Sequence, residues 1–152
     1  MVREALRRAF SFPGALAATL VFWVIARAAT AVWDPDLWFH VRNVEYLIAH
    51  GTPPHVDLYS YTTSSHPYLN HQLLAEIPYY LAWRAGGLLG VYALFVSLLL
   101  VIHFGICYWA YSRSRNLKAA FLVACLSTFL TSISFGPRTL LFSYIFLLVL
   151  LL

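Results

Sequence analysis

Four apolar runs, separated by polar segments, constrain this chain more than any other feature of its sequence. They cover residues 13–32, 87–111, 119–135 and 139–152. A run of about 20 apolar residues is long enough to cross the hydrocarbon core of a bilayer as a helix. Because 61% of the residues are hydrophobic and only 11% are charged, a soluble domain is excluded. We predict an all-α membrane protein with about four transmembrane helices and the lipid bilayer as its surroundings.

The last apolar run is shorter than a complete span. A helix over residues 139–152 reaches only about 21 Å, whereas the hydrocarbon core is about 30 Å thick. We therefore expect the fourth helix to be truncated. The length of 152 residues leaves room for one membrane domain, residues 1–152, and none for a separate folded domain.

Basic residues at the ends of the apolar runs predict the orientation of the chain. They form two clusters, which are Arg3, Arg7 and Arg8 before the first run, and Arg113, Arg115 and Lys118 in the loop 112–118. Short basic loops are retained on the cytoplasmic side of a membrane. We expect a bacterial inner-membrane protein with a cytoplasmic N-terminus and a large external loop over residues 33–86. The net charge of +4 is then a topology signal, and no nucleic-acid partner is expected.

The external loop holds most of the residues that could carry chemistry. Five of the six acidic residues and five of the six histidines lie in it: Asp34, Asp36, Glu45, Asp57, Glu76, His40, His50, His55, His66 and His71. A functional site is therefore expected in this loop.

An amphipathic helix is predicted over residues 37–48, the first helix of the loop. Its apolar residues recur at intervals of three and four: Leu37, Trp38, Val41, Val44, Leu47 and Ile48. Trp33 and Trp38 suit a membrane interface, so we expect the helix to lie on the membrane surface. Its other face carries Asp36, His40 and Asn43, which are spaced to reach a common ligand. A solvated helix face is the alternative interpretation.

Asp34 and Asp36 flank Pro35 just before this helix. One aspartate at such a position can cap the helix, but capping does not explain two. A carboxylate can also abstract a hydroxyl proton or bind a hard divalent cation. Both aspartates are candidate catalytic residues and candidate metal ligands, with a divalent cation as the candidate cofactor.

A second amphipathic helix is predicted over residues 71–84. Its apolar residues lie on one side: Leu73, Leu74, Ile77 and Leu81. Its polar residues His71, Gln72 and Glu76 lie elsewhere on the helix. We expect Asn70 to cap this helix and Pro78 to kink it. Its polar end is expected to face the first loop helix.

Several segments resemble the GT-C superfamily, whose members are integral membrane glycosyltransferases that use polyprenyl-phosphate sugars, and in particular the protein O-mannosyltransferases. In chain order they are residues 34–40 (DPDLWFH), 51–54 (GTPP), 57–62 (DLYSYT), 70–76 (NHQLLAE), and Arg138 before residues 141–144 (LFSY). The resemblance implies two juxtamembrane helices in the first external loop. It also implies inverting sugar transfer at the outer membrane face.

The resemblance implies roles for individual residues as well. Asp34 or Asp36 would deprotonate the acceptor, and Arg138 would bind the lipid phosphate through its fork of donors. Together with the polar face of the first loop helix, the candidate catalytic residues are Asp34, Asp36, His40, His71 and Glu76, and the candidate substrate-binding residues are Asn43, Gln72 and Arg138.

Two departures from the family pattern bear on activity. Gln72 stands where many relatives carry a glutamate, and relatives continue through several more spans. We therefore expect an N-terminal module or shortened relative that is too short to be active alone. The alternative is a catalytically silent subunit of a larger respiratory or photosynthetic membrane complex, with other membrane subunits as its partners.

Two ionisable residues fall inside the predicted spans. We expect Arg27 to extend toward the membrane interface or to pair with an aspartate of the loop. His103 is expected to hydrogen-bond a neighbouring helix, and a pigment or haem ligand is the alternative.

Overall fold

The structure is a computed structural model that describes residues 11–29, 34–62, 66–132 and 136–152. Within these ranges it contains five helices: α2 (Phe12–Ala28), α3 (Asp36–His50), α4 (Leu73–Ser114), α5 (Leu117–Thr131) and α6 (Leu140–Leu151). An isolated bridge between Val56 and Pro67 is the sole β-type pairing in the described part of the chain. The predicted all-helical architecture is confirmed.

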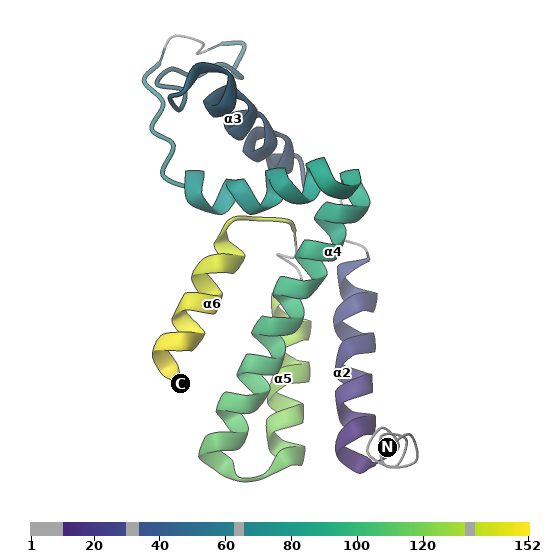
Figure 1. Ribbon diagram of the computed structural model, residues 1–152. Coiled ribbons are helices and arrows are strands. Elements are labelled where there is room, and N and C mark those ends of the chain that lie inside the picture. The colour runs from purple at the N-terminus through teal and green to yellow at the C-terminus, as the bar shows by residue number, and fades with distance from the viewer. Residues whose placement is uncertain (1–10, 30–33, 63–65, 133–135) are drawn as a thin grey trace.

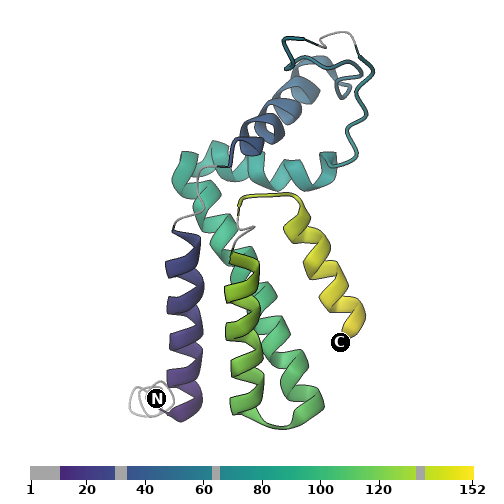
Figure 2. The same ribbon diagram turned by 180° about the vertical axis from the view of Figure 1, so that it is seen from behind.

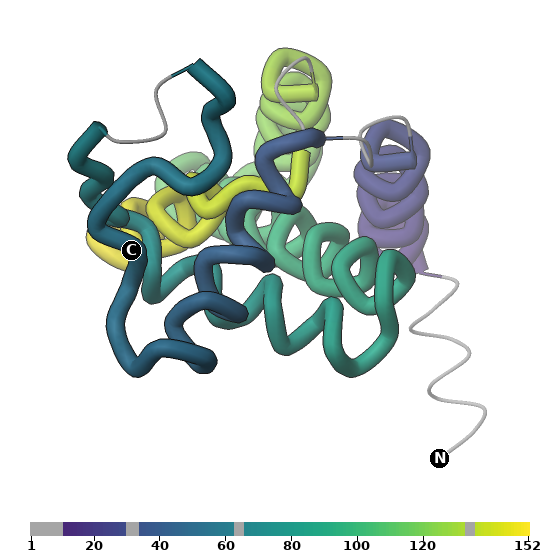
Figure 3. The backbone as a smooth tube through the Cα atoms, turned by 90° about the horizontal axis from the view of Figure 1, so that it is seen from above, coloured from purple at the N-terminus to yellow at the C-terminus, as the bar shows by residue number. Residues whose placement is uncertain are grey.

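The helices form two layers (Figure 1). α2, α5, α6 and the long second part of α4 run side by side, and we refer to them as the upright helices. α3 and the first part of α4 lie across one end of these helices, and the view from behind shows the same crossing (Figure 2). Seen from above, α3 crosses the first part of α4 while α2 stands to one side (Figure 3).

A break inside α4 creates the turn between the two layers. The backbone leaves helical geometry at Gly86 (φ −152°, ψ 18°) and at Gly87 (φ 57°, ψ −141°). The positive φ of Gly87 lies in a region that glycine adopts without steric cost. The expected boundary between the second loop helix and the next span falls here. Pro78, where a kink was expected, lies inside α4 and keeps helical backbone angles, and the sharp break falls at the glycine pair.

The core lies where α2, α4 and α5 meet. Its buried apolar residues include Leu20, Val24 and Ala28 of α2, Val91, Phe95 and Leu99 of α4, and Ala120 and Ala124 of α5. The two alanines of α5 are fully buried. Small side chains of this kind let helices approach closely, as they do in membrane-helix packing.

The outer faces of the upright helices are strongly apolar. Large exposed side chains include Phe22 (70%), Leu122 (65%), Phe146 (69%) and Leu150 (83%). By length and composition, α4 can cross a membrane, whereas α2, α5 and α6 are shorter apolar helices of 17, 15 and 12 residues. Among the described residues the structure therefore shows one clear candidate span where four were predicted.

The far end of the upright helices carries the second basic cluster. α4 ends at Ser114, and its C-cap residue Arg115 has a left-handed backbone (φ 53°). Asn116 caps α5 by accepting from the N–H groups of Lys118 and Ala119. The Lys118 ammonium lies 5.8 Å from the ring centre of Phe12, at the start of α2. The start of the first apolar helix and the basic loop thus lie together, while Arg3, Arg7, Arg8 and Trp33 lie outside the described residues.

Candidate functional site

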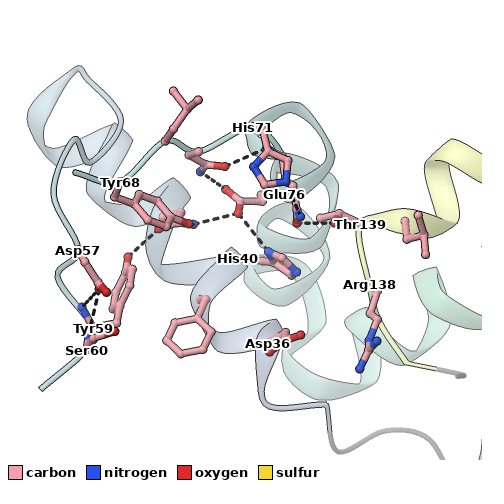
Figure 4. A pocket seen from close by; sticks show the side chains of 16 residues that line it. Asp36, His40, Asp57, Tyr59, Ser60, Tyr68, His71, Glu76, Arg138 and Thr139 are labelled. Atoms are coloured by element: carbon pink, nitrogen blue, oxygen red, sulfur yellow. Dashed lines mark hydrogen bonds and ion pairs between the residues drawn. The ribbon is translucent and has the colours of Figure 1, made fainter. Parts of the chain in front are cut away.

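A polar cavity of about 530 Å³ lies between α3, the start of α4 and the start of α6. Its walls include candidates from all three helices and several loop residues, which are Asp36, Phe39, His40, Asn43, Asp57, Tyr59, Ser60, Tyr68, Leu69, Asn70, His71, Gln72, Glu76, Arg138, Thr139 and Leu140. Asp57 and Tyr59 lie at one end, Arg138 and Thr139 at the other, and Glu76 between them (Figure 4). Seven of the eight candidate catalytic and substrate-binding residues line this cavity; Asp34 does not.

Glu76 is the centre of a buried hydrogen-bond network. Its side chain is almost fully buried, and Oε1 accepts from His40 Nδ1 at 3.0 Å and from Asn43 Nδ2 at 2.9 Å. Oε2 accepts from Asn70 Nδ2 at 2.7 Å. Both oxygens are therefore occupied by donors, as a buried carboxylate requires. With this geometry, Glu76 is better placed to hold α3 and the loop against α4 than to accept a proton from a substrate.

The polar face of α3 is covered, so the solvated-face interpretation was wrong for His40 and Asn43. These residues are 8% and 0% exposed, and their side chains pack against Glu76, which accepts hydrogen bonds from both. Asn43 also donates to Tyr68 Oη at 3.1 Å and accepts from Tyr59 Oη at 2.8 Å. Burial raises the pKa of Tyr59, so its hydroxyl remains protonated and able to donate.

Asn70 does not cap α4, contrary to the prediction. Gln72 is the N-cap residue and makes no side-chain cap bond. Asn70 Oδ1 accepts from the Gln72 backbone N–H at 3.0 Å, and its amide is used to bind Glu76. The loop is thus joined to α4 through the carboxylate of Glu76 and not through a helix cap.

Asp36 and His71 are exposed residues of the site. Asp36 begins α3 and lines the cavity, and no described residue makes a hydrogen bond to its carboxylate. His71 Nε2 lies 3.1 Å from Gln72 Nε2. Of the two candidate acceptor bases, Asp36 is therefore the one that faces the cavity.

Asp34 instead forms an ion pair with Arg138. Arg138 Nε donates to Asp34 Oδ2 at 2.6 Å, and the side chains are 50% and 6% exposed respectively. The hydrogen bond and the negative charge of Asp34 raise the pKa of Arg138, which keeps its full positive charge. The two aspartates of the D-P-D segment thus have different surroundings.

Two further hydrogen bonds hold the start of α6 against α4. Tyr79 Oη donates to the backbone carbonyl of Arg138 at 2.9 Å, and Thr139 Oγ1 donates to Gln72 Oε1 at 2.6 Å. Burial raises the pKa of Tyr79, so the donor proton of this contact is retained. Gln72, a predicted substrate-binding residue, is therefore joined to α6 through its side-chain oxygen.

A second, mainly apolar cavity of about 480 Å³ lies between α4, α5 and α6. Most of its lining is aliphatic: Leu99, Ile102, Ile106, Leu130, Leu140, Leu141, Leu147, Leu148 and Leu151, with His103, Ser127, Thr131, Gly136, Arg138 and Tyr144. Arg138 and Leu140 line both cavities. Arg138 therefore contributes to the walls of both a polar cavity and an apolar one.

No family model, no curated protein and no solved structure matches this chain. In the described part of the chain, no group of three or more His, Cys, Asp and Glu side chains could hold a metal ion. Asp34, one of the two candidate metal ligands, is paired with Arg138.

The ionisable residues of the upright helices contact neighbouring helices. His103 is buried on α4, its Nδ1 lies 2.7 Å from the Leu99 carbonyl, and its Nε2 lies 3.5 Å from Thr131 Oγ1 of α5. This agrees with the interhelical contact expected of His103. Arg27 Nη2 donates to Ser132 Oγ at 2.7 Å, which links α2 to the end of α5.

The sequence did not predict four contributions to the site. They are those of Tyr59, Tyr68 and Thr139, and the hydrogen bond that Asn70 donates to Glu76. Tyr59, Tyr68 and Asn70 lie in a loop without helical periodicity, and Thr139 was assigned to an apolar span. The clustering of tyrosines beside Asp57 was the one available signal, because buried tyrosine hydroxyls need polar partners.

Proposed function

We propose that the upright helices α2, α4, α5 and α6 lie in a lipid bilayer. Only 28% of the most apolar stretch of α4 is buried within the structure, whereas the core helix of a soluble protein is mostly buried. The large apolar side chains on the outer faces would be costly in water and are solvated well by lipid. The basic loop 112–118 would then lie in the cytoplasm of a bacterial inner membrane, and α3 on the outer side.

We propose further that the chain is the N-terminal module, or a shortened relative, of a GT-C glycosyltransferase that uses a polyprenyl-phosphate sugar. The observation that carries this proposal is the position of Arg138 between the two cavities. A polyprenyl-phosphate sugar has an apolar chain, an anionic phosphate and a polar sugar in this order. An apolar cavity, an arginine and a polar cavity follow one another in the same order.

In the proposed reaction, Asp36 accepts the proton of an acceptor hydroxyl, as its exposed carboxylate in the cavity permits. The acceptor oxygen then bonds to the anomeric carbon from the face opposite the phosphate. The bond between the anomeric carbon and the phosphate oxygen breaks, and its electron pair stays on that oxygen. Arg138 stabilises the charge of the departing polyprenyl phosphate.

Membranes of the cells in which the chain occurs naturally, with its membrane partners present, are compared with membranes of the same cells without the chain to test this function. We expect the producing membranes to transfer label from a radiolabelled polyprenyl-phosphate hexose to an acceptor. Asp36→Asn should remove this transfer. Glu45→Gln is the matched control, because Glu45 is also on α3 but pairs with Arg42 outside the cavity. Equal transfer with and without the chain would contradict the proposal.

A second candidate function is that of a silent structural subunit in a larger membrane complex. It is favoured by the Glu76 network, in which His40, Asn43 and Asn70 all serve to hold the loop in place. Mass spectrometry of the native protein in mild detergent distinguishes the two. Fixed stoichiometric partner subunits together with no donor binding would favour the structural role.

A further inference from the structure

The Asp34 carboxylate lies in a gap that Gly136 leaves open. A Cβ atom on Gly136 would lie 3.3 Å from both Cβ and Cγ of Asp34, and closer still to its carboxylate oxygen Oδ2. The absence of a side chain at Gly136 therefore lets the carboxylate sit against the backbone that precedes α6. With 6% of its side chain exposed, Asp34 is poorly placed to exchange partners or to reach a substrate.

Both carboxylate oxygens of Asp34 accept hydrogen bonds. The donor from Arg138 is Nε, the guanidinium nitrogen that is bonded to the side-chain carbon Cδ. Oδ1 accepts from the Asp36 backbone N–H at 3.1 Å, and Oδ2 accepts from Arg138 Nε at 2.6 Å. A guanidinium has five N–H donors, and the two terminal amino groups form the fork that binds a phosphate or carboxylate. Asp34 uses Nε, and no residue in the described ranges bonds to the terminal amino groups, so the terminal fork of the half-exposed Arg138 is left for a ligand.

We propose that Asp34 is a positioning residue for Arg138 and not the proton acceptor. It fixes the guanidinium through Nε so that the terminal amino groups face a phosphate at the junction of the two cavities. This inference rests on the proposed function, which supplies the phosphate. It divides the D-P-D segment into two roles, with Asp34 orienting the anion site and Asp36 exposed to the polar cavity.

Two substitutions of Asp34 separate this role from its rivals. Asn keeps an oxygen that can accept from Arg138 Nε but removes the negative charge, whereas Ala removes both. If Asp34 positions Arg138, Asp34→Asn should bind phosphate at least as well as the wild type, and Asp34→Ala should bind it less well. If Asp34 instead only competes with phosphate for Arg138, both variants should bind phosphate more tightly than the wild type. A catalytic base predicts that Asp34→Asn abolishes sugar transfer, whereas positioning predicts that transfer is retained.

The full chain in detergent is titrated with farnesyl phosphate, farnesol and inorganic phosphate by isothermal calorimetry. We expect Asp34→Ala to weaken farnesyl phosphate binding by about tenfold, since the hydrogen bond that orients the arginine is lost. Asp34→Asn should not weaken it. Farnesyl phosphate that binds well above inorganic phosphate identifies a lipid headgroup as the ligand, and equal binding identifies free phosphate.

The orientation of Arg138 is also measured without any ligand. The Nε–H proton of Arg138, assigned by its loss in Arg138→Lys, should exchange slowly with water in the wild type and in Asp34→Asn, and rapidly in Asp34→Ala. Equal exchange in all three, or equal loss of binding in both Asp34 variants, would overturn the positioning role. If the wild type does not prefer farnesyl phosphate to farnesol, the proposed function fails, and this inference fails with it.

Discussion

Asn43 of α3 and Glu76 of α4 are joined by a 2.9 Å hydrogen bond, although 33 positions separate them in the sequence. Both side chains are essentially inaccessible to solvent. The bond is part of a network in which one carboxylate receives three donors. The crossing of α3 over α4, and with it the shape of the polar cavity, depends on this carboxylate.

Glu76→Ala should destabilise the protein severely. The substitution leaves the buried donors of His40, Asn43 and Asn70 without their acceptor, at a cost of about 3 kcal/mol or more in the free energy of unfolding. Thermal unfolding in detergent, followed by circular dichroism, measures the loss. Glu45→Ala is the control, since it breaks only a surface pair with Arg42 and should change stability by about 0.5 kcal/mol or less. Equal effects of the two substitutions would show that the network does not hold the fold.

Asp36→Asn should separate activity from stability. The carboxylate is exposed and begins α3, so its loss costs at most the interaction with the helix dipole, about 1 kcal/mol or less. Sugar transfer should nevertheless fall to background, because the proton acceptor is gone. Parallel transfer assays and melting curves test this, and retained transfer in a folded variant would remove Asp36 from the role of base.

Gly136→Ala should displace Asp34 and thereby weaken the anion site. The new methyl group would collide with the Asp34 carboxylate and would also lie 3.3 Å from Cβ and Cγ of Asp34, so the whole side chain must shift. Gly105→Ala is the matched control, because its Cβ would meet only the end of the flexible Leu148 side chain at 2.9 Å. We expect Gly136→Ala to lower the affinity for farnesyl phosphate by about tenfold, comparable to loss of a charge-assisted bond. Unchanged affinity would mean that the gap at Gly136 is not needed.

Filling the apolar cavity should affect lipid binding but not phosphate binding. Ile106→Trp places a large ring in a space lined by α4, α5 and α6. It should reduce farnesyl phosphate affinity by about tenfold, through lost burial of apolar surface, and leave inorganic phosphate affinity unchanged. Leu122→Trp, at a 65% exposed position outside this cavity, serves as control. Equal affinities for farnesyl phosphate in both variants would show that the isoprenoid chain lies elsewhere.

The helices could be predicted from the sequence because each has its own local pattern. The periodicity over residues 37–48 predicted α3, which extends over Asp36–His50. The paired Gly86 and Gly87 mark the break in α4 better than Pro78, since a sharp turn requires backbone angles that glycine adopts easily.

The partners of the polar residues could not be predicted in the same way. Spacing places His40 and Asn43 on one face, but it does not show whether that face meets water or another helix. The pairing of Asp34 with Arg138 joins positions 104 residues apart, and each was suggested as a site residue without the other. Such contacts depend on how helices cross, which local periodicity does not encode.

The most direct test of the account is the binding of undecaprenyl phosphate to the purified full chain, measured by native mass spectrometry. The central claim is that Arg138 binds a lipid phosphate between the two cavities. It predicts that the wild type retains undecaprenyl phosphate but not undecaprenol, and that Arg138→Ala loses this preference. Equal retention of the phosphate and the alcohol by the wild type, or an unchanged preference in Arg138→Ala, would contradict it.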